Sequence, residues 1–123
     1  MLKKILKWIP AFIILCISWY LSCQSKIENM PNFRFSDKVC HCICFAGFSF
    51  FVSFACNLFT KKRIWIPVLI VGVYGLIDEY HQHFTPGRSV SLFDWYADLA
   101  GAIIGAVCFI WFYKHVFQKL KNR

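Results

Sequence analysis

Acidic and imidazole side chains occur in pairs one helical turn apart in this 123-residue sequence, at the ends of apolar segments. Asp37 and His41 form one pair and Asp94 and Asp98 form another, so each pair shares one face of a helix. An imidazole beside a carboxylate can carry protons, and clustered carboxylates can pair an acid with a base or bind a hard divalent cation. The spacing matches no specific metal motif. The pattern therefore indicates a site for hydrolysis, group transfer or cation binding.

A third polar set lies at the end of another apolar segment. Asp78, Glu79 and Gln82 precede a tight turn at Pro86-Gly87, and the turn carries Arg88. A guanidinium group can bind a phosphate or carboxylate through two parallel hydrogen bonds. The alternative is that Arg88 neutralises a neighbouring acid, Asp94 or Glu79.

Four apolar segments must position these residues. The chain is 59% hydrophobic and only 16% charged, which is far from the average of soluble domains. Each segment is long enough to cross a bilayer as a helix. We expect an all-α fold, a four-helix transmembrane bundle in one domain over residues 1–123, with spans at about 5–21, 39–59, 64–83 and 92–113.

The basic residues predict the orientation of this bundle. Ten of the 14 Lys and Arg residues lie on the side of the termini, so both termini are expected to be cytoplasmic. Because these residues flank apolar segments and form no basic stripe, no nucleic-acid partner is expected. The four basic residues expected on the outer side are Lys26, Arg34, Lys38 and Arg88.

The N-terminal segment also has features of a cleaved signal peptide, and cleavage after it would leave three spans.

Small residues indicate which face of the fourth span packs against other helices. Asp98, Gly101 and Gly105 share one face, and the two glycines form a Gly-x-x-x-Gly pair. Both aspartates of this span should therefore point into the bundle. Gly72 and Gly75 give the third span a similar close-packing face.

The polar residues also belong to motifs that run through nearly the whole chain. They are Ser22, Asp37-Lys38-x-x-His41, Tyr74-Gly75-x-x-Asp78-Glu79-x-x-Gln82, and Phe84-Thr85-Pro86-Gly87-Arg88-Ser89-x-Ser91-x-x-Asp94 followed by x-x-x-Asp98-x-x-Gly101-x-x-x-Gly105. In these residues the chain resembles the VanZ-like family of bacterial integral membrane proteins. One departure is Asp98, where such proteins more often carry Asn. The resemblance implies a place in the bacterial cytoplasmic membrane and, for the name-giving members, low-level resistance to the glycopeptide teicoplanin.

These observations lead to one main hypothesis. An outward-facing polar pocket binds or modifies an amphiphile, either a lipid-linked cell-wall precursor or a lipoglycopeptide. In an enzymatic version, Glu79 or Asp94 is the base or metal ligand, His41 is a proton shuttle oriented by Asp37, and Arg88 clamps an anion. The sequence specifies no cofactor. The residues expected to bind the substrate are Ser22, Gln82, Arg88, Ser89 and Asp98.

A second hypothesis belongs to a different class. The carboxylates then only hold the helix ends together in a non-catalytic interaction subunit, because buried polar groups can join membrane helices. Ion transport is disfavoured, since no ionisable residue continues a path through the centre of the bilayer. His81 and His83 are interpreted as interfacial residues.

Overall fold

The computed structural model describes residues 1–24 and 32–123. This part of the chain consists of helices and the turns between them, with no strand. The expected all-α class is therefore confirmed. Lys26, one of the basic residues expected on the outer side, lies outside the described residues.

Four helical segments in the described ranges are long and apolar enough to cross a membrane. Their bounds are Leu2–Ser22, Ser36–Ala55, Lys61–Gln82 and Leu92–Lys121. Short breaks divide the first and third segments, and a π-helical stretch, η2, divides the fourth without a gap. The individual helices are α1 (Leu2–Leu6), α2 (Ile9–Ser22), α3 (Ser36–Ala55), η1 (Lys61–Arg63), α4 (Trp65–Gln82), α5 (Leu92–Phe112), η2 (Tyr113–Phe117) and α6 (Gln118–Lys121).

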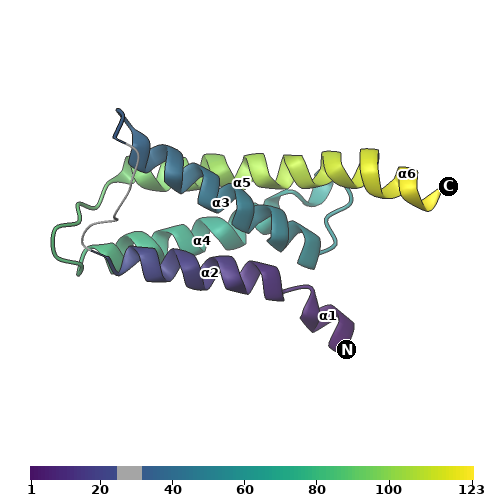
Figure 1. The fold of residues 1–123 in the computed structure, drawn as a ribbon, viewed down its shortest axis with the longest axis horizontal. Helices are drawn as coiled ribbons and strands as arrows, with labels where there is room; N and C mark the ends of the chain where they lie inside the picture. The colour runs from purple at the N-terminus through teal and green to yellow at the C-terminus, as the bar shows by residue number, and fades with distance from the viewer. Residues whose placement is uncertain (25–31) are drawn as a thin grey trace.

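The four long segments lie side by side, and both chain termini lie at one end of the bundle (Figure 1). At the opposite end, α2 and α4 finish while α3 and α5 begin. We call this end, with the loop 83–91, the polar end, because the carboxylates of the sequence gather there. Large apolar side chains cover the outside of the helices. Such a surface fits a lipid bilayer and is rare on a soluble monomer.

Helix α3 ends several residues before its expected limit, and its last turn explains why. Asn57 adopts a left-handed conformation with φ of 53°. The amide of Leu58 donates to the carbonyl of Ser53 at 2.9 Å, and the amide of Asn57 donates to the carbonyl of Phe54 at 3.2 Å. This pair of hydrogen bonds is the Schellman arrangement that terminates helices. Asn is one of the few residues that tolerates the left-handed position, so the helix stops at Ala55.

The two glycines of α5 are the points of closest approach to α3. A Cβ atom on Gly101 would collide with the backbone oxygen of Cys42, and one on Gly105 would collide with the backbone oxygen of Ala46. Because Cys42 and Ala46 lie one turn apart, the Gly-x-x-x-Gly pair makes a continuous strip of backbone contact. This contact fixes the register of α3 against α5, and the polar residues of both helices depend on that register.

A substitution at this contact should lower stability markedly. We expect Gly105→Ala to reduce the free energy of unfolding in detergent by about 1–3 kcal/mol, since a rigid backbone atom occupies the space of the new methyl group. The matched control is Gly47→Ala on α3, where a Cβ meets only the Ile14 side chain at 3.7 Å. Thermal unfolding of both purified variants measures the difference, and equal stability would contradict the assigned helix contact.

Candidate functional site

Two pairs of side chains connect α3 and α5 at the polar end. Lys38 Nζ lies 3.2 Å from Asp94 Oδ1, and His41 Nδ1 lies 2.9 Å from Asp98 Oδ1. In both pairs α3 supplies the basic group and α5 supplies the carboxylate. Since the two pairs follow each other by about one turn on both helices, they form a short ladder across the helix contact.

Helix α4 adds further polar groups to this ladder. Asp78, Glu79 and Gln82 are all buried, and the amide of Gln82 donates to Asp78 Oδ2 at 3.3 Å. The absence of a side chain on Gly75 makes room for the α5 carboxylate, because a Cβ there would lie only 3.1 Å from Asp98 Oδ2. Three helices therefore meet around one group of acids, which we call the carboxylate cluster: Asp78, Glu79, Asp94 and Asp98.

Several oxygens of the carboxylate cluster are buried without a hydrogen-bond partner among the residues described. These atoms include both oxygens of Glu79, Oδ2 of Asp98 and Oδ1 of Asp78. Glu79 is 5% exposed and Asp98 is fully buried. Burying such groups unsatisfied costs free energy, so these oxygens call for a proton or a partner that the described side chains do not supply.

One donor atom from each of three helices converges within this cluster. An imidazole nitrogen of His41, a carboxylate oxygen of Glu79 and a carboxylate oxygen of Asp98 all lie within 4.8 Å of one another. His41 was predicted as a candidate from its spacing to Asp37, and Glu79 from its place after the third apolar segment. The structure brings both to Asp98, one of the five residues expected to bind substrate.

The expected orientation of His41 by Asp37 is wrong. His41 bonds to Asp98 on the neighbouring helix, whereas Asp37 has a half-exposed side chain whose Oδ2 lies 3.3 Å from Lys38 Nζ. The reason is the helix rotation imposed by the glycine contact, which directs the imidazole toward α5. Asp98 is therefore the positioning residue for His41, and Asp37 lies at the rim of the site.

Arg88 occupies a tight turn in the loop between α4 and α5, as predicted. The amide of Arg88 donates to the carbonyl of Thr85 at 3.2 Å, and Gly87 has φ of 79°. With Pro86 before Gly87, these features define a type II turn, which requires a positive φ at its third residue. The alternative in which Arg88 neutralises Asp94 is not what the described residues show, because Lys38 forms that ion pair.

The remaining predicted residues lie at the edges of the site. Ser22 is buried at the end of α2, and its hydroxyl lies 3.3 Å from Nδ1 of His81. Its carbonyl accepts a hydrogen bond of 3.3 Å from Thr85, which ties the turn to α2. Ser89 is exposed in the loop after the turn.

Three polar residues contribute more to the polar end than the sequence predicts. The sequence predicts Lys38 only as an outer charge, does not include Asp78 among the site residues, and predicts an interfacial His81. His81 stacks on Trp19 with ring centroids 4.1 Å apart and contacts Ser22. A usable signal existed for Asp78, because it lies one turn from Gln82. The partners of Lys38 and His81 belong to other helices, so spacing along the chain does not reveal them.

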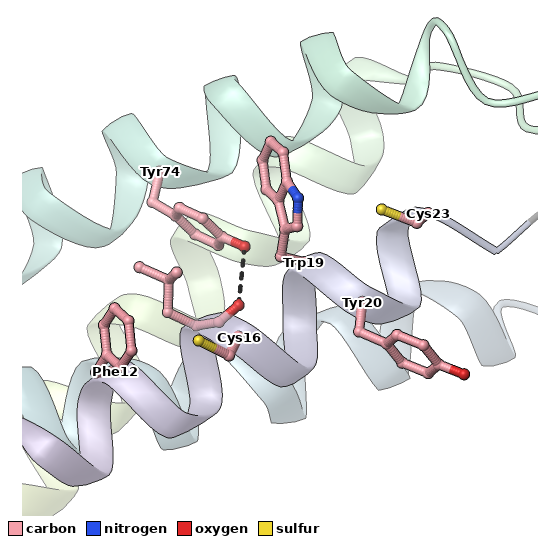
Figure 2. Close-up of a pocket in the computed structure, with 7 residues that line it drawn as sticks. Phe12, Cys16, Trp19, Tyr20, Cys23 and Tyr74 are labelled. Carbon is pink, nitrogen blue, oxygen red and sulfur yellow. Dashed lines mark hydrogen bonds between the residues drawn. The ribbon is translucent and has the colours of Figure 1, made fainter.

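An open apolar groove of about 600 Å³ runs between α2 and α4 (Figure 2). Trp19 of α2 and Tyr74 of α4 point toward each other's helices, and the Tyr74 hydroxyl donates to the carbonyl of Leu15 at 3.4 Å. Cys23 is the lining residue nearest the polar end, and its sulfur lies 3.8 Å from Nε2 of His81. The groove is open and apolar, and its lining extends toward the polar end as far as Cys23. Its lining consists of Phe12, Leu15, Cys16, Trp19, Tyr20, Cys23 and Tyr74.

The fold and the site define a class of protein: a multi-pass membrane protein with a buried group of carboxylates at one end of a four-helix bundle. Residues 3–113 match the VanZ/LLP1 family. The chain belongs to this family, and the resemblance inferred from its motifs is confirmed.

A curated relative of the chain occurs in the fission yeast Schizosaccharomyces pombe. This uncharacterized protein, C11E3.10, is 28% identical over 110 residues. The match covers 89% of this chain and 65% of the yeast protein. No solved structure matches the chain significantly.

Proposed function

We propose that the protein binds or modifies an amphiphile of the cell envelope in a polar pocket formed by the carboxylate cluster, His41 and Arg88. The substrate class is a lipid-linked cell-wall precursor or a lipoglycopeptide such as teicoplanin. The pocket faces the outer leaflet of a bacterial cytoplasmic membrane, with both termini in the cytoplasm. This orientation rests on the excess of Lys and Arg at the ends near the termini.

One observation carries the proposal: Glu79 is buried between three helices while both of its carboxylate oxygens lack a partner in the described ranges. An ionisable group beside the bilayer is costly, and such groups mark functional sites more often than structural ones. A carboxylate that served only helix packing would be expected to hold a hydrogen bond across helices.

The groove between α2 and α4 supports an amphiphilic substrate. It is apolar and exposed on the lipid side, with Phe12 and Tyr20 each 65% exposed. Its volume falls within the usual range of small-molecule sites. An acyl or prenyl chain in this groove would place its polar end near His81 and Ser22, at the polar end of the bundle.

The geometry around Glu79 and His41 supports the chemical roles that we propose. Glu79 has free oxygens to accept a proton or bind a cation, and His41, held by Asp98, can pass a proton onward. Arg88 binds an anionic group such as a phosphate at the mouth of the pocket. Gln82 and Ser89 offer further hydrogen bonds to the polar part of the substrate.

Growth in the presence of teicoplanin tests this proposal. We expect expression of the wild-type protein in a sensitive bacterium to raise the inhibitory concentration of teicoplanin, and both Glu79→Gln and Arg88→Ala to remove the increase. The matched control is Arg34→Ala, an exposed Arg at the same end of the bundle, which should behave as wild type. Immunoblots establish equal membrane levels, and full protection in both site variants would reject the proposed pocket.

A specific observation favours a packing role for one part of the cluster. Asp94 is paired with Lys38 across α3 and α5, so this acid stabilises the helix contact whatever the substrate is. We propose that the non-catalytic interpretation applies to this pair, and the functional one to Glu79, His41 and Asp98. The two interpretations predict stability effects of opposite sign.

A further inference from the structure

We infer that His41, Glu79 and Asp98 form a binding site for one divalent transition-metal ion, with Zn²⁺ and Mn²⁺ as the ions of suitable chemistry. This inference deepens the proposed function, because it assigns a ligand to the same pocket and depends on that pocket. Three residues from three different helices provide the ligand atoms, and these atoms lie within 4.8 Å of one another.

The burial of the free oxygens is the independent observation that points to a ligand. Glu79 is 5% exposed and Asp98 fully buried, yet both Glu79 oxygens and Asp98 Oδ2 lack hydrogen-bond partners in residues 1–24 and 32–123. Two close carboxylates repel each other in a low-dielectric environment. A divalent cation supplies two positive charges and satisfies these oxygens together.

The contact of 2.9 Å between His41 Nδ1 and Asp98 Oδ1 already brings an imidazole nitrogen and a carboxylate oxygen together. A metal ion bound by both atoms would replace the proton that they share, because ligating imidazoles bind metals through a deprotonated nitrogen. Ligand atoms around a tetrahedral Zn²⁺ are separated by about 3.4 Å. The three donor atoms lie within 4.8 Å of one another, so metal binding requires them to move closer together.

The mixed donor set narrows the choice of ion. Ca²⁺ and Mg²⁺ prefer sites made entirely of oxygen, whereas one imidazole with two carboxylates suits Zn²⁺, Mn²⁺ or Fe²⁺. Three protein ligands leave at least one coordination position open. An anionic group of the amphiphile, or a water molecule, can take that position beside Arg88.

Metal analysis of the purified protein tests the inference. Untagged protein in detergent is stripped with a chelator, resupplied with Zn²⁺ or Mn²⁺ and freed of excess ion before elemental analysis. We expect close to one ion per chain in the wild type and an affinity reduced by at least about tenfold in Glu79→Gln. The control His83→Ala removes an exposed imidazole at the same end and should retain the ion.

A second measurement keeps the test valid if one variant folds poorly. Mn²⁺ bound to the wild type should show the magnetic coupling to an imidazole nitrogen in pulsed electron paramagnetic resonance, and His41→Ala should lose it. Asp98→Asn keeps the shape of the side chain and should weaken binding as Glu79→Gln does. A stoichiometry far below one, or equal binding in all variants, overturns the metal site. If the purified wild type binds no metal but its expression still protects against teicoplanin, the proposed function stands and the metal site is rejected. If the wild type binds metal but gives no protection, the metal site stands and the proposed function is rejected.

Discussion

Replacement of Glu79 by Gln is expected to stabilise the metal-free protein while it abolishes function. Glu79 is 5% exposed, and one of its carboxylate oxygens lies within 4.8 Å of a carboxylate oxygen of Asp98. Neither of its oxygens is hydrogen-bonded within the described part of the chain. The neutral amide removes the repulsion and the cost of a buried charge. We expect a gain of about 1 kcal/mol or more in the free energy of unfolding.

Thermal unfolding in one detergent, with chelator present, measures this gain. The control Tyr80→Phe changes the neighbouring residue on α4, which is 69% exposed toward the lipid side, and should leave the stability close to that of wild type. Substitutions that raise stability and lower activity are typical of functional residues held in an unfavourable environment. A Glu79→Gln variant that unfolds earlier than wild type would instead support a structural role for this carboxylate.

Replacement of Lys38 by Met is expected to have the opposite effect. Lys38 is the ion-pair partner of Asp94, whose side chain is only 9% exposed. Its removal leaves a buried carboxylate without a cation, which destabilises proteins by about 3–5 kcal/mol when both partners are fully buried. Because the Lys38 side chain is 30% exposed, we expect a smaller loss of about 2 kcal/mol.

Two further variants separate the ion pair from the loss of a side chain. Lys38→Arg retains the positive charge and should remain within about 0.5 kcal/mol of wild type. The double variant Lys38→Met, Asp94→Asn should recover most of the stability lost in Lys38→Met, since the unpaired charge is gone. Additive losses in the double variant would mean that the two side chains do not interact.

The sequence predicts the helices well because they depend on local properties. Apolar segments of membrane-spanning length specify four helices, and the spacing of Asp98, Gly101 and Gly105 correctly places the aspartate inside the bundle. The turn at Pro86-Gly87 is also predictable, since proline and glycine each fit one defined position of a type II turn.

The cross-helix partners follow from properties that are not local. Spacing along the chain places His41 and Asp37 on one helix face, but the rotation of α3 against α5 decides that the imidazole meets Asp98 instead. The same rotation places Lys38 Nζ 3.2 Å from Asp94 Oδ1. That rotation is set by backbone contacts at Gly101 and Gly105, and its angle is not encoded in a pattern of residue types.

The early end of α3 has a similar cause. Asn57 takes a left-handed conformation that only becomes favourable when the two hydrogen bonds of the Schellman arrangement form around it. Leu58 is then buried at 1% exposure beside Phe109 and Ile110. An apolar run alone suggests continued helix through these residues, so the stop depends on packing against α5.

Direct binding of an amphiphile tests the central claim, that the buried cluster at the polar end recognises the polar part of an envelope lipid. The measurement is native mass spectrometry of the protein released from detergent with undecaprenyl phosphate, and with phosphatidylglycerol as the comparison lipid. We expect one retained polyprenyl phosphate per wild-type chain, retention reduced at least about tenfold in both Arg88→Ala and Glu79→Gln, and unchanged retention in Arg34→Ala. Equal retention of both lipids in all four proteins would contradict the account.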